Sequence, residues 1–390
     1  MSVASRVRQV APSPTLALAA RTKALVKSGV FIADFTAGEP DFDTPAHIKA
    51  VAQAAIQEGF TKYTASSGTP ELRQAIVEKL RRDNGLTYQP SQVVVSCGAK
   101  HSLYNIFQVL CERGDEVVIP SPYWVSYAEM VRLAEATPVL VQTSADRDFK
   151  MTPQELDAAI TPRTKALVLN SPSNPVGSVY NRQELRGLSD VLVKRRIWVI
   201  SDEIYEKITY DGVEAVSIAT VESSLLDRAL IVNGVSKTYA MTGWRIGYAA
   251  GPAEIMSAID TLQSHATSNP TSISQRAALA AITGDQQCVT EMVAAFRQRR
   301  DLMVQRLQQI GLRVIRPSGA FYVFCCIKNV KSTAAEVAQW WLEEAKVAVV
   351  PGEGFGNADY VRFSFACGEA TIRDGMDRIE RLLRSSGSAR

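Results

Sequence analysis

Several polar and charged side chains follow short apolar runs in the middle of the chain. Asn174 lies in the Pro-rich string SPSNPVG after one run, Asp202 ends the next, and Tyr205 follows three residues later. Lys237 and Arg245 come after a third run. If the runs are parallel strands, their carboxyl ends meet at one edge of a sheet, where open α/β sheets bind ligands. We therefore expect these side chains to share one site.

This set of side chains matches the chemical needs of pyridoxal 5'-phosphate. The amine of Lys237 can form a Schiff base with the cofactor's aldehyde, and Asp202 can keep its pyridine nitrogen protonated. Asn174 and Tyr205 are candidates to hydrogen-bond the ring hydroxyl, and Trp124 in SPYWVSY is the candidate to stack on the ring. We expect Lys237, Asp202 and Tyr205 to be the catalytic residues.

The phosphate of this cofactor needs backbone N–H groups, hydroxyls and a cation. Gly98 and Ala99 lie just before an expected helix, whose first N–H groups can bind an anion. Ser236 supplies a hydroxyl and Arg245 a cation. Taken singly, each candidate has a simpler role as a helix cap, turn or surface residue. The prediction depends on their order and their common sheet edge.

Alternating apolar runs and amphipathic stretches predict the elements that position these residues. The expected strands are 93–97, 116–120, 139–143, 166–170, 198–202, 229–233 and 246–250. Residues 100–110 and 182–194 repeat apolar side chains at helical spacing. Short buried runs separated by helices favour an α/β fold with a mostly parallel sheet sandwiched by helices.

The chain length of 390 residues allows a second, smaller domain. Residues 291–310 read as a long charged helix, and 320–326 and 347–350 as strands of a smaller α/β domain. We expect an N-terminal arm and part of the small domain in 1–45, a large cofactor-binding domain in 46–290, and the small C-terminal domain in 291–390. The smaller domain would thus be built from both chain ends.

Composition excludes several other classes of protein. Lys plus Arg number 43 and Asp plus Glu 40, so a net charge of +3 gives no basic face for nucleic acid or a membrane. Three histidines and six cysteines show no metal-site or CxxC spacing. We expect no metal and a cytoplasmic location, with a plastid as the alternative if a longer precursor exists.

Four strings resemble those of class I pyridoxal-phosphate-dependent aminotransferases: AGEPDF (37–42), SPSNPVG, SDEIYE (201–206) and SKTYAMTGWRIGY (236–248). Within that family, the chain is most similar to the bacterial and plastid-type aspartate, or glutamate/aspartate–prephenate, aminotransferase subgroup. The resemblance covers nearly the whole chain. It implies a fold-type I transferase with a seven-stranded sheet, and a homodimer with active sites at the subunit interface.

Carried onto this chain, the resemblance makes Lys237 the lysine that bonds the cofactor and then moves the proton between Cα and C4′. It assigns Tyr63 to the phosphate of the neighbouring subunit and Arg362 to the substrate's α-carboxylate. The implied cofactor-binding set is Gly98, Ala99, Lys100, Trp124, Asn174, Asp202, Tyr205, Ser236, Lys237, Arg245 and Tyr63. The implied substrate-binding set is Gly38, Trp124, Asn174, Arg362, Lys100 and Thr15.

Three positions bear on specificity and on the fit to the family. Lys100 matches a lysine thought to help recognise dicarboxylic substrates, and Thr15 matches a threonine that prephenate-using relatives place near the substrate. Val176 stands where the family's SPxNPTG string has threonine, so a hydroxyl is lost beside the cofactor turn. We expect that loss to have little effect, because Asn174 and Gly177 are kept.

We expect amino transfer between L-aspartate or L-glutamate and a 2-oxo acid such as 2-oxoglutarate, oxaloacetate or prephenate. A carbon–sulfur lyase or a cyclopropane-carboxylate synthase on the same fold is an alternative. A non-catalytic cofactor-binding regulator is another, although the chain has no helix-turn-helix extension or basic flank to support it.

Overall fold

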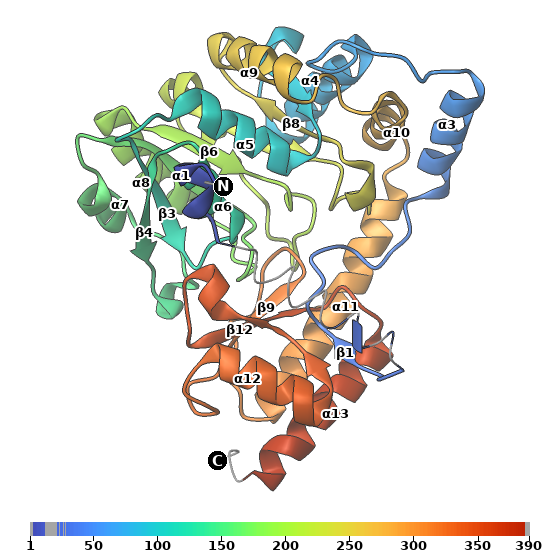
Figure 1. The fold of residues 1–390 in the computed structure, drawn as a ribbon, viewed down its shortest axis with the longest axis vertical. Coiled ribbons are helices and arrows are strands. Elements are labelled where there is room, and N and C mark those ends of the chain that lie inside the picture. The colour runs from blue at the N-terminus through green and yellow to red at the C-terminus, as the bar shows by residue number, and fades with distance from the viewer. Residues whose placement is uncertain (1–2, 12–21, 23, 26, 28, 387–390) are drawn as a thin grey trace.

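A computed structural model of the chain describes residues 3–11, 22, 24–25, 27 and 29–386. Figure 1 shows two parts, a larger sheet with helices on both faces and a smaller group of helices and strands below it. The C-terminal segment and β1 (Ala33–Asp34), which comes from near the N-terminus, both lie in the smaller group.

The larger part is built around a seven-stranded sheet with the strand order β2-β8-β7-β6-β5-β3-β4. Its strands are β2 (Val93–Ser96), β3 (Glu116–Ser121), β4 (Thr137–Gln142), β5 (Thr164–Asn170), β6 (Trp198–Asp202), β7 (Ala229–Gly234) and β8 (Gly247–Ala250). The strands from β4 to β7 pair in parallel, and β8 runs antiparallel to both β7 and β2. The expected α/β fold with a mostly parallel sheet is confirmed, and each expected strand ends within two residues of the observed one.

Helices cover both faces of this sheet, which explains why its central strands are almost continuously apolar. The α-helices that the structure describes before the smaller part are α1 (Ser5–Arg8), α3 (Ala46–Gln57), α4 (Pro70–Asn84), α5 (Ala99–Leu110), α6 (Ser126–Leu133), α7 (Pro153–Ala159), α8 (Arg182–Arg195), α9 (Ala253–Ala266) and α10 (Ser272–Thr283). The helices α11 (Gln287–Gln309), α12 (Ala334–Trp340) and α13 (Glu369–Ser385) contribute to the core of the smaller part. The apolar residues of α5, α6 and α9 pack on one face, and those of α4, α8 and α10 pack on the other.

The smaller part contains two short sheets. β9 (Tyr322–Cys326), β11 (Val350–Pro351) and β12 (Tyr360–Ser364) form an antiparallel sheet in the order β11-β12-β9. β10 (Val347–Ala348) pairs in parallel with β1. The single strand expected over 347–350 is therefore wrong, because half of it pairs with a segment more than 300 residues away in the chain.

The N-terminal arm contacts the larger part at α6. The backbone N–H of Ala11 donates to Oε2 of Glu129 at 3.1 Å. Thr15, a candidate substrate-binding residue, lies outside the described residues.

Three further observations concern the residues that the structure describes. None of their helices is long and apolar enough to cross a membrane. Their His, Cys, Asp and Glu side chains form no group of three that could hold a metal ion. All six cysteines are present as free thiols.

Gly375 of α13 packs against the segment that carries β1. This contact allows a test of how tightly the two ends of the chain pack together. A β-carbon at Gly375 would lie 2.5 Å from Cε2 of Phe35, a fully buried ring. We expect Gly375→Val to lower the free energy of unfolding by about 2 kcal/mol through overpacking, measured by urea denaturation. Ala370→Val, at an exposed site on the same helix, should change it by no more than about 0.5 kcal/mol, and equal losses would contradict the proposed contact.

Candidate active site

A cavity of about 440 Å³ lies where the carboxyl ends of β5 and β6 and the turn after β7 meet the smaller part. Its walls contain most of the site residues expected from the sequence: Gly38, Ala99, Lys100, Trp124, Asn174, Asp202, Tyr205, Ser236, Lys237, Arg245 and Arg362. Gly98 immediately precedes Ala99. The four cations of this set, Lys100, Lys237, Arg245 and Arg362, all face the same space.

Sheet register brings these side chains together from distant parts of the chain. Asn170 at the end of β5 is paired with Asp202 at the end of β6, and Asp202 with Val232 of β7. The turns that follow carry Asn174, Tyr205 and Lys237.

Asp202 is buried and held by two hydrogen bonds. Its Oδ2 accepts from the hydroxyl of Tyr127 at 2.6 Å, and its Oδ1 accepts from the backbone N–H of Ile204 at 3.2 Å. Burial raises the pKa of Asp202 to about 6, although both hydrogen bonds and the charge of Lys237 favour the ionised form. A cationic ring nitrogen beside this carboxylate would favour its ionised form and offset the cost of its burial.

Lys237 is half-buried and donates from Nζ to the carbonyl oxygen of Gly38 at 2.6 Å. Burial lowers the pKa of Lys237 to about 8, and the positive charges of Arg245 and Arg362 act in the same direction. The carboxylate of Glu39 opposes them. A lysine with such a pKa is partly neutral near pH 8, which is the form that attacks an aldehyde and accepts a proton.

A glycine turn and a guanidinium form an anion-binding corner of the cavity. Gly98 has a φ of 91°, and a β-carbon there would lie 2.3 Å from Nη2 of Arg245. Only glycine therefore lets the guanidinium approach this turn. Gly98 also gives no side-chain cap to α5, so the helix's first N–H groups can bind an anion.

Arg362 enters the cavity from β12 and is almost completely buried. Its Nη1 donates to Oδ1 of Asn174 at 3.1 Å, and its Nη2 donates to the carbonyl oxygen of Thr36 at 2.9 Å. The Nε atom is buried without a partner among the described residues. Burial also lowers the pKa of Arg362. An incoming carboxylate would supply both the missing acceptor and the missing countercharge.

Four aromatic side chains complete the cavity wall. The hydroxyl of Tyr205 lies 2.9 Å from that of Tyr322, which comes from β9 of the smaller part. Trp124 makes an edge-to-face contact with Tyr127, and Nζ of Lys100 lies 4.8 Å from the centre of the Trp124 ring. Burial and the nearby Arg245 lower the pKa of Lys100, so a negatively charged ligand would be favoured at this position.

Two residues of the sequence prediction lie elsewhere. Tyr63 is 91% exposed and is not part of the cavity wall. Val176 also lies off that wall and is buried in an apolar cluster with Phe149, Phe324 and Phe355. Because its side chain packs between the larger and smaller parts, the loss of a threonine hydroxyl removes no group from the cavity.

Sequence reasoning missed several residues of the cavity. Tyr127 and Tyr322, which hydrogen-bond Asp202 and Tyr205, were not singled out. Glu39, which accepts from the hydroxyl of Thr242 at 2.6 Å, was also missed. Tyr127 and Glu39 lie within the quoted strings SPYWVSY and AGEPDF, so those strings could have indicated them. Tyr322 gave no such signal, because its partner is 117 residues away.

Comparison with known proteins agrees with this geometry. Residues 32–379 match the family model of class I and II aminotransferases. The chain belongs to this family.

Relatives of this aminotransferase match it over almost its full length. The aspartate aminotransferase of Geobacillus stearothermophilus is 48% identical over 99% of this chain and 100% of its own. The aspartate/prephenate aminotransferase of Cereibacter sphaeroides is 47% identical over 95% and 96% of the two chains. The solved structure of Thermus thermophilus aspartate aminotransferase with maleate has a TM-score of 0.96 and 44% identity, covering 98% of this chain and 100% of that one.

The charges around Lys237 of this aminotransferase can be tested by amine acylation, because only a neutral amine reacts. In the cofactor-free protein, labelling of Lys237 should rise with pH around a midpoint of about 8, as followed by mass spectrometry. Glu39→Gln removes a charge that raises this pKa, so its midpoint should move lower. Lys328, whose pKa is raised by Asp359, should label only at higher pH in both proteins. An unchanged or higher midpoint in Glu39→Gln would rule out this role for Glu39.

Proposed function

We propose that the protein is a pyridoxal-phosphate-dependent aspartate aminotransferase that moves amino groups between L-aspartate or L-glutamate and 2-oxo acids. The observation that carries the proposal is the single cavity that holds the amine of Lys237, the carboxylate of Asp202 and the guanidinium of Arg362. The names of its full-length relatives support the choice of aspartate.

The residues present fit the cofactor. The Gly98–Arg245 corner offers N–H groups and a cation to its phosphate, together with Ser236. Asp202 offers a buried carboxylate to its ring nitrogen, and Trp124 offers an aromatic face. When bound, pyridoxal phosphate supplies an aldehyde that bonds an amine and a ring that accepts electrons released at the substrate's α-carbon.

The chain's own groups then have distinct tasks. Lys237 moves the proton from the substrate's Cα to C4′, and its lowered pKa suits both acceptance and return of that proton. Asp202 holds the proton of the ring nitrogen, and Tyr127 fixes the carboxylate by its hydrogen bond. Asn174 and Tyr205 orient the ring through its hydroxyl. Arg362 binds the substrate's α-carboxylate, for which its buried Nε atom is available.

Substrate choice depends on a second cation in this proposal. Lys100, which lies in the cavity wall beside Trp124, binds the side-chain carboxylate of aspartate or glutamate. Use of prephenate is proposed as well, because aspartate/prephenate aminotransferases are among the full-length relatives. Gly38 completes the substrate site next to Lys237.

We also propose that the protein acts as a homodimer in the cytoplasm. Tyr63 is 91% exposed, and Val51 and Ile56 of α3 expose 37% and 53% of their surface. Exposed aromatic and aliphatic side chains fit a subunit interface, where Tyr63 would reach the neighbour's phosphate. Six free thiols suit a reducing compartment.

The covalent role of Lys237 gives the decisive experiment. After addition of pyridoxal phosphate and reduction with borohydride, peptide mapping should find the cofactor on Lys237. Lys237→Ala should lose this label and slow amino transfer from aspartate to 2-oxoglutarate by about 10³-fold or more. Lys328→Ala, at an exposed lysine, is the control and should keep both properties. Full transfer activity in Lys237→Ala would refute the proposal.

The same assay separates the alternatives. Release of pyruvate and ammonia without a 2-oxo acid acceptor would indicate a lyase. A cofactor adduct on Lys237 without any turnover would indicate a regulator.

Lys100 provides a test of specificity. A charge-assisted hydrogen bond contributes about 1.5–3 kcal/mol, so Lys100→Met should lower kcat/KM for aspartate roughly 10- to 100-fold. The value for a neutral amino acid such as phenylalanine should change little, and Lys100→Arg should retain part of the preference. Equal losses with both substrates would assign Lys100 to the cofactor and not to the substrate side chain.

A further inference from the structure

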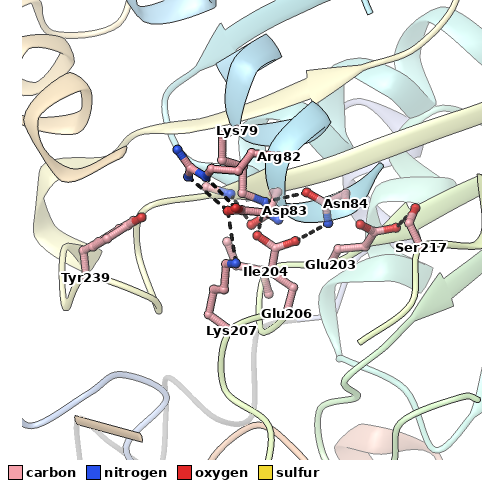
Figure 2. A network of polar contacts seen from close by, with 12 residues as sticks. Lys79, Arg82, Asp83, Asn84, Glu203, Ile204, Glu206, Lys207, Ser217 and Tyr239 are labelled. Carbon is pink, nitrogen blue, oxygen red and sulfur yellow. Dashed lines mark hydrogen bonds and ion pairs between the residues drawn. The ribbon is translucent and has the colours of Figure 1, made fainter. Parts of the chain in front are cut away.

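A buried cluster of charges adjoins the cavity but contributes nothing to its wall. Figure 2 shows it between the C-terminal end of α4, which provides Lys79, Asp83 and Asn84, and the turn after β6, which provides Glu206 and Lys207. The side chains of Lys79 and Glu206 are each only 6% exposed. The proposed reaction uses none of these residues.

Lys79, Asn84 and Glu206 form a closed ring of polar contacts. Nζ of Lys79 pairs with Oε1 of Glu206 and donates to Oδ1 of Asn84 at 2.8 Å. Nδ2 of Asn84 donates to Oε2 of Glu206 at 2.6 Å. Both oxygens of Glu206 are therefore used, and its carboxylate can adopt few other orientations.

Three further contacts hold the same turn. Nζ of Lys207 lies 3.0 Å from Oδ2 of Asp83. On the other side of the turn, Oε1 of the buried Glu203 accepts from the hydroxyls of Ser201 at 2.9 Å and Ser217 at 2.6 Å. The turn is thus tied to α4 by two ion pairs, and the carboxylate of Glu203 ties it to Ser217 (Figure 2) and to Ser201 of β6.

The last residue of β6 and the residues of the turn are divided between the cavity and the network. Asp202 and Tyr205 line the cavity, whereas Glu203 and Glu206 bind the network. Hydrogen bonds within the turn connect the two sets of residues. The N–H of Glu206 donates to the carbonyl oxygen of Glu203 at 2.9 Å. The N–H of Ile204 donates to Oδ1 of Asp202 at 3.2 Å. A shift of Glu206 would therefore move Tyr205 and the N–H that orients Asp202.

A buried ion pair is a costly way to join a helix to a turn, since apolar side chains of similar size often stabilise a fold as well or better. What the ion pair adds is direction, because its hydrogen bonds fix the orientation of Glu206. We propose that Lys79 and Glu206 are positioning residues that hold the turn after β6, residues 203–208, so that Asp202 and Tyr205 keep their places in the cavity. This inference rests on the proposed cofactor-dependent function.

Hydrogen–deuterium exchange of the cofactor-free chain tests the anchoring. In Glu206→Gln, the amides of 203–208 should exchange about tenfold faster than in the wild type, while those of β5 and β7 stay protected. This measurement needs no cofactor. Unchanged exchange in the turn would overturn the proposal.

The pH titration of the visible absorbance of bound pyridoxal phosphate tests the consequence for the site. Asp202 and Tyr205 would contact the cofactor's ring. The midpoint of this absorbance titration in Glu206→Gln should therefore differ from that of the wild type by about one pH unit. Faster exchange with an unmoved midpoint would also overturn the proposal, since the pair would then anchor the turn without positioning the catalytic groups.

Two variants separate positioning from general destabilisation. Glu116→Gln alters another buried carboxylate, bound to Thr161 and Arg163 at the amino end of β3, and should leave both the exchange of 203–208 and the midpoint unchanged. Lys79→Met/Glu206→Leu removes both charges and should melt near the wild-type temperature while keeping the faster exchange and the shifted midpoint. Wild-type behaviour of this double variant would refute the need for a directed ion pair.

The two proposals fail in different ways. If the wild-type protein binds no pyridoxal phosphate, the proposed function is wrong, and the positioning of a cofactor site falls with it. If the wild type binds the cofactor but the variants match it in exchange and in titration, only the further inference is wrong.

Discussion

The parallel register of β5, β6 and β7 is the constraint on which the rest of the site depends. It sets Asn170 beside Asp202, and Asp202 beside Val232, two residues before the end of β7, so the three following turns meet at one edge of the sheet. A slip of one residue in β6 would turn Asp202 to the opposite face, because side chains alternate along a strand. The helices on both faces prevent this, since they bury β6 along nearly its whole length.

The second feature that shapes the site is a set of buried charges without sufficient partners. Lys237, Arg245 and Arg362 face one cavity in a protein whose total charge is only +3. Burial lowers the pKa values of Lys237 and Arg362 and raises that of Asp202, so the site holds charges that lack solvation and lack sufficient partners. Such a site favours a ligand with two or more negative groups and one protonated ring nitrogen. Pyridoxal phosphate together with an amino acid would supply these groups.

The smaller part of the molecule supplies contacts that the larger part lacks. Arg362 of β12 binds Asn174 of the larger part and the carbonyl of Thr36, and Tyr322 of β9 binds Tyr205. The site is therefore assembled across the boundary between the two parts. The Lys79–Glu206 pair also acts on the turn after β6, so this turn is held both by α4 and by Tyr322 of β9.

The sequence by itself determined the seven strands of the larger sheet, the sheet type and most of the cavity wall, because apolar runs and the strings around Asn174, Asp202 and Lys237 are local patterns. Only the tertiary structure decided the pairing of β1 with β10, the hydrogen bond between Tyr205 and Tyr322, and the burial of Lys79 against Glu206. Each of these joins residues more than 100 positions apart. Local periodicity carries no information about such contacts, since they depend on how the packed elements meet.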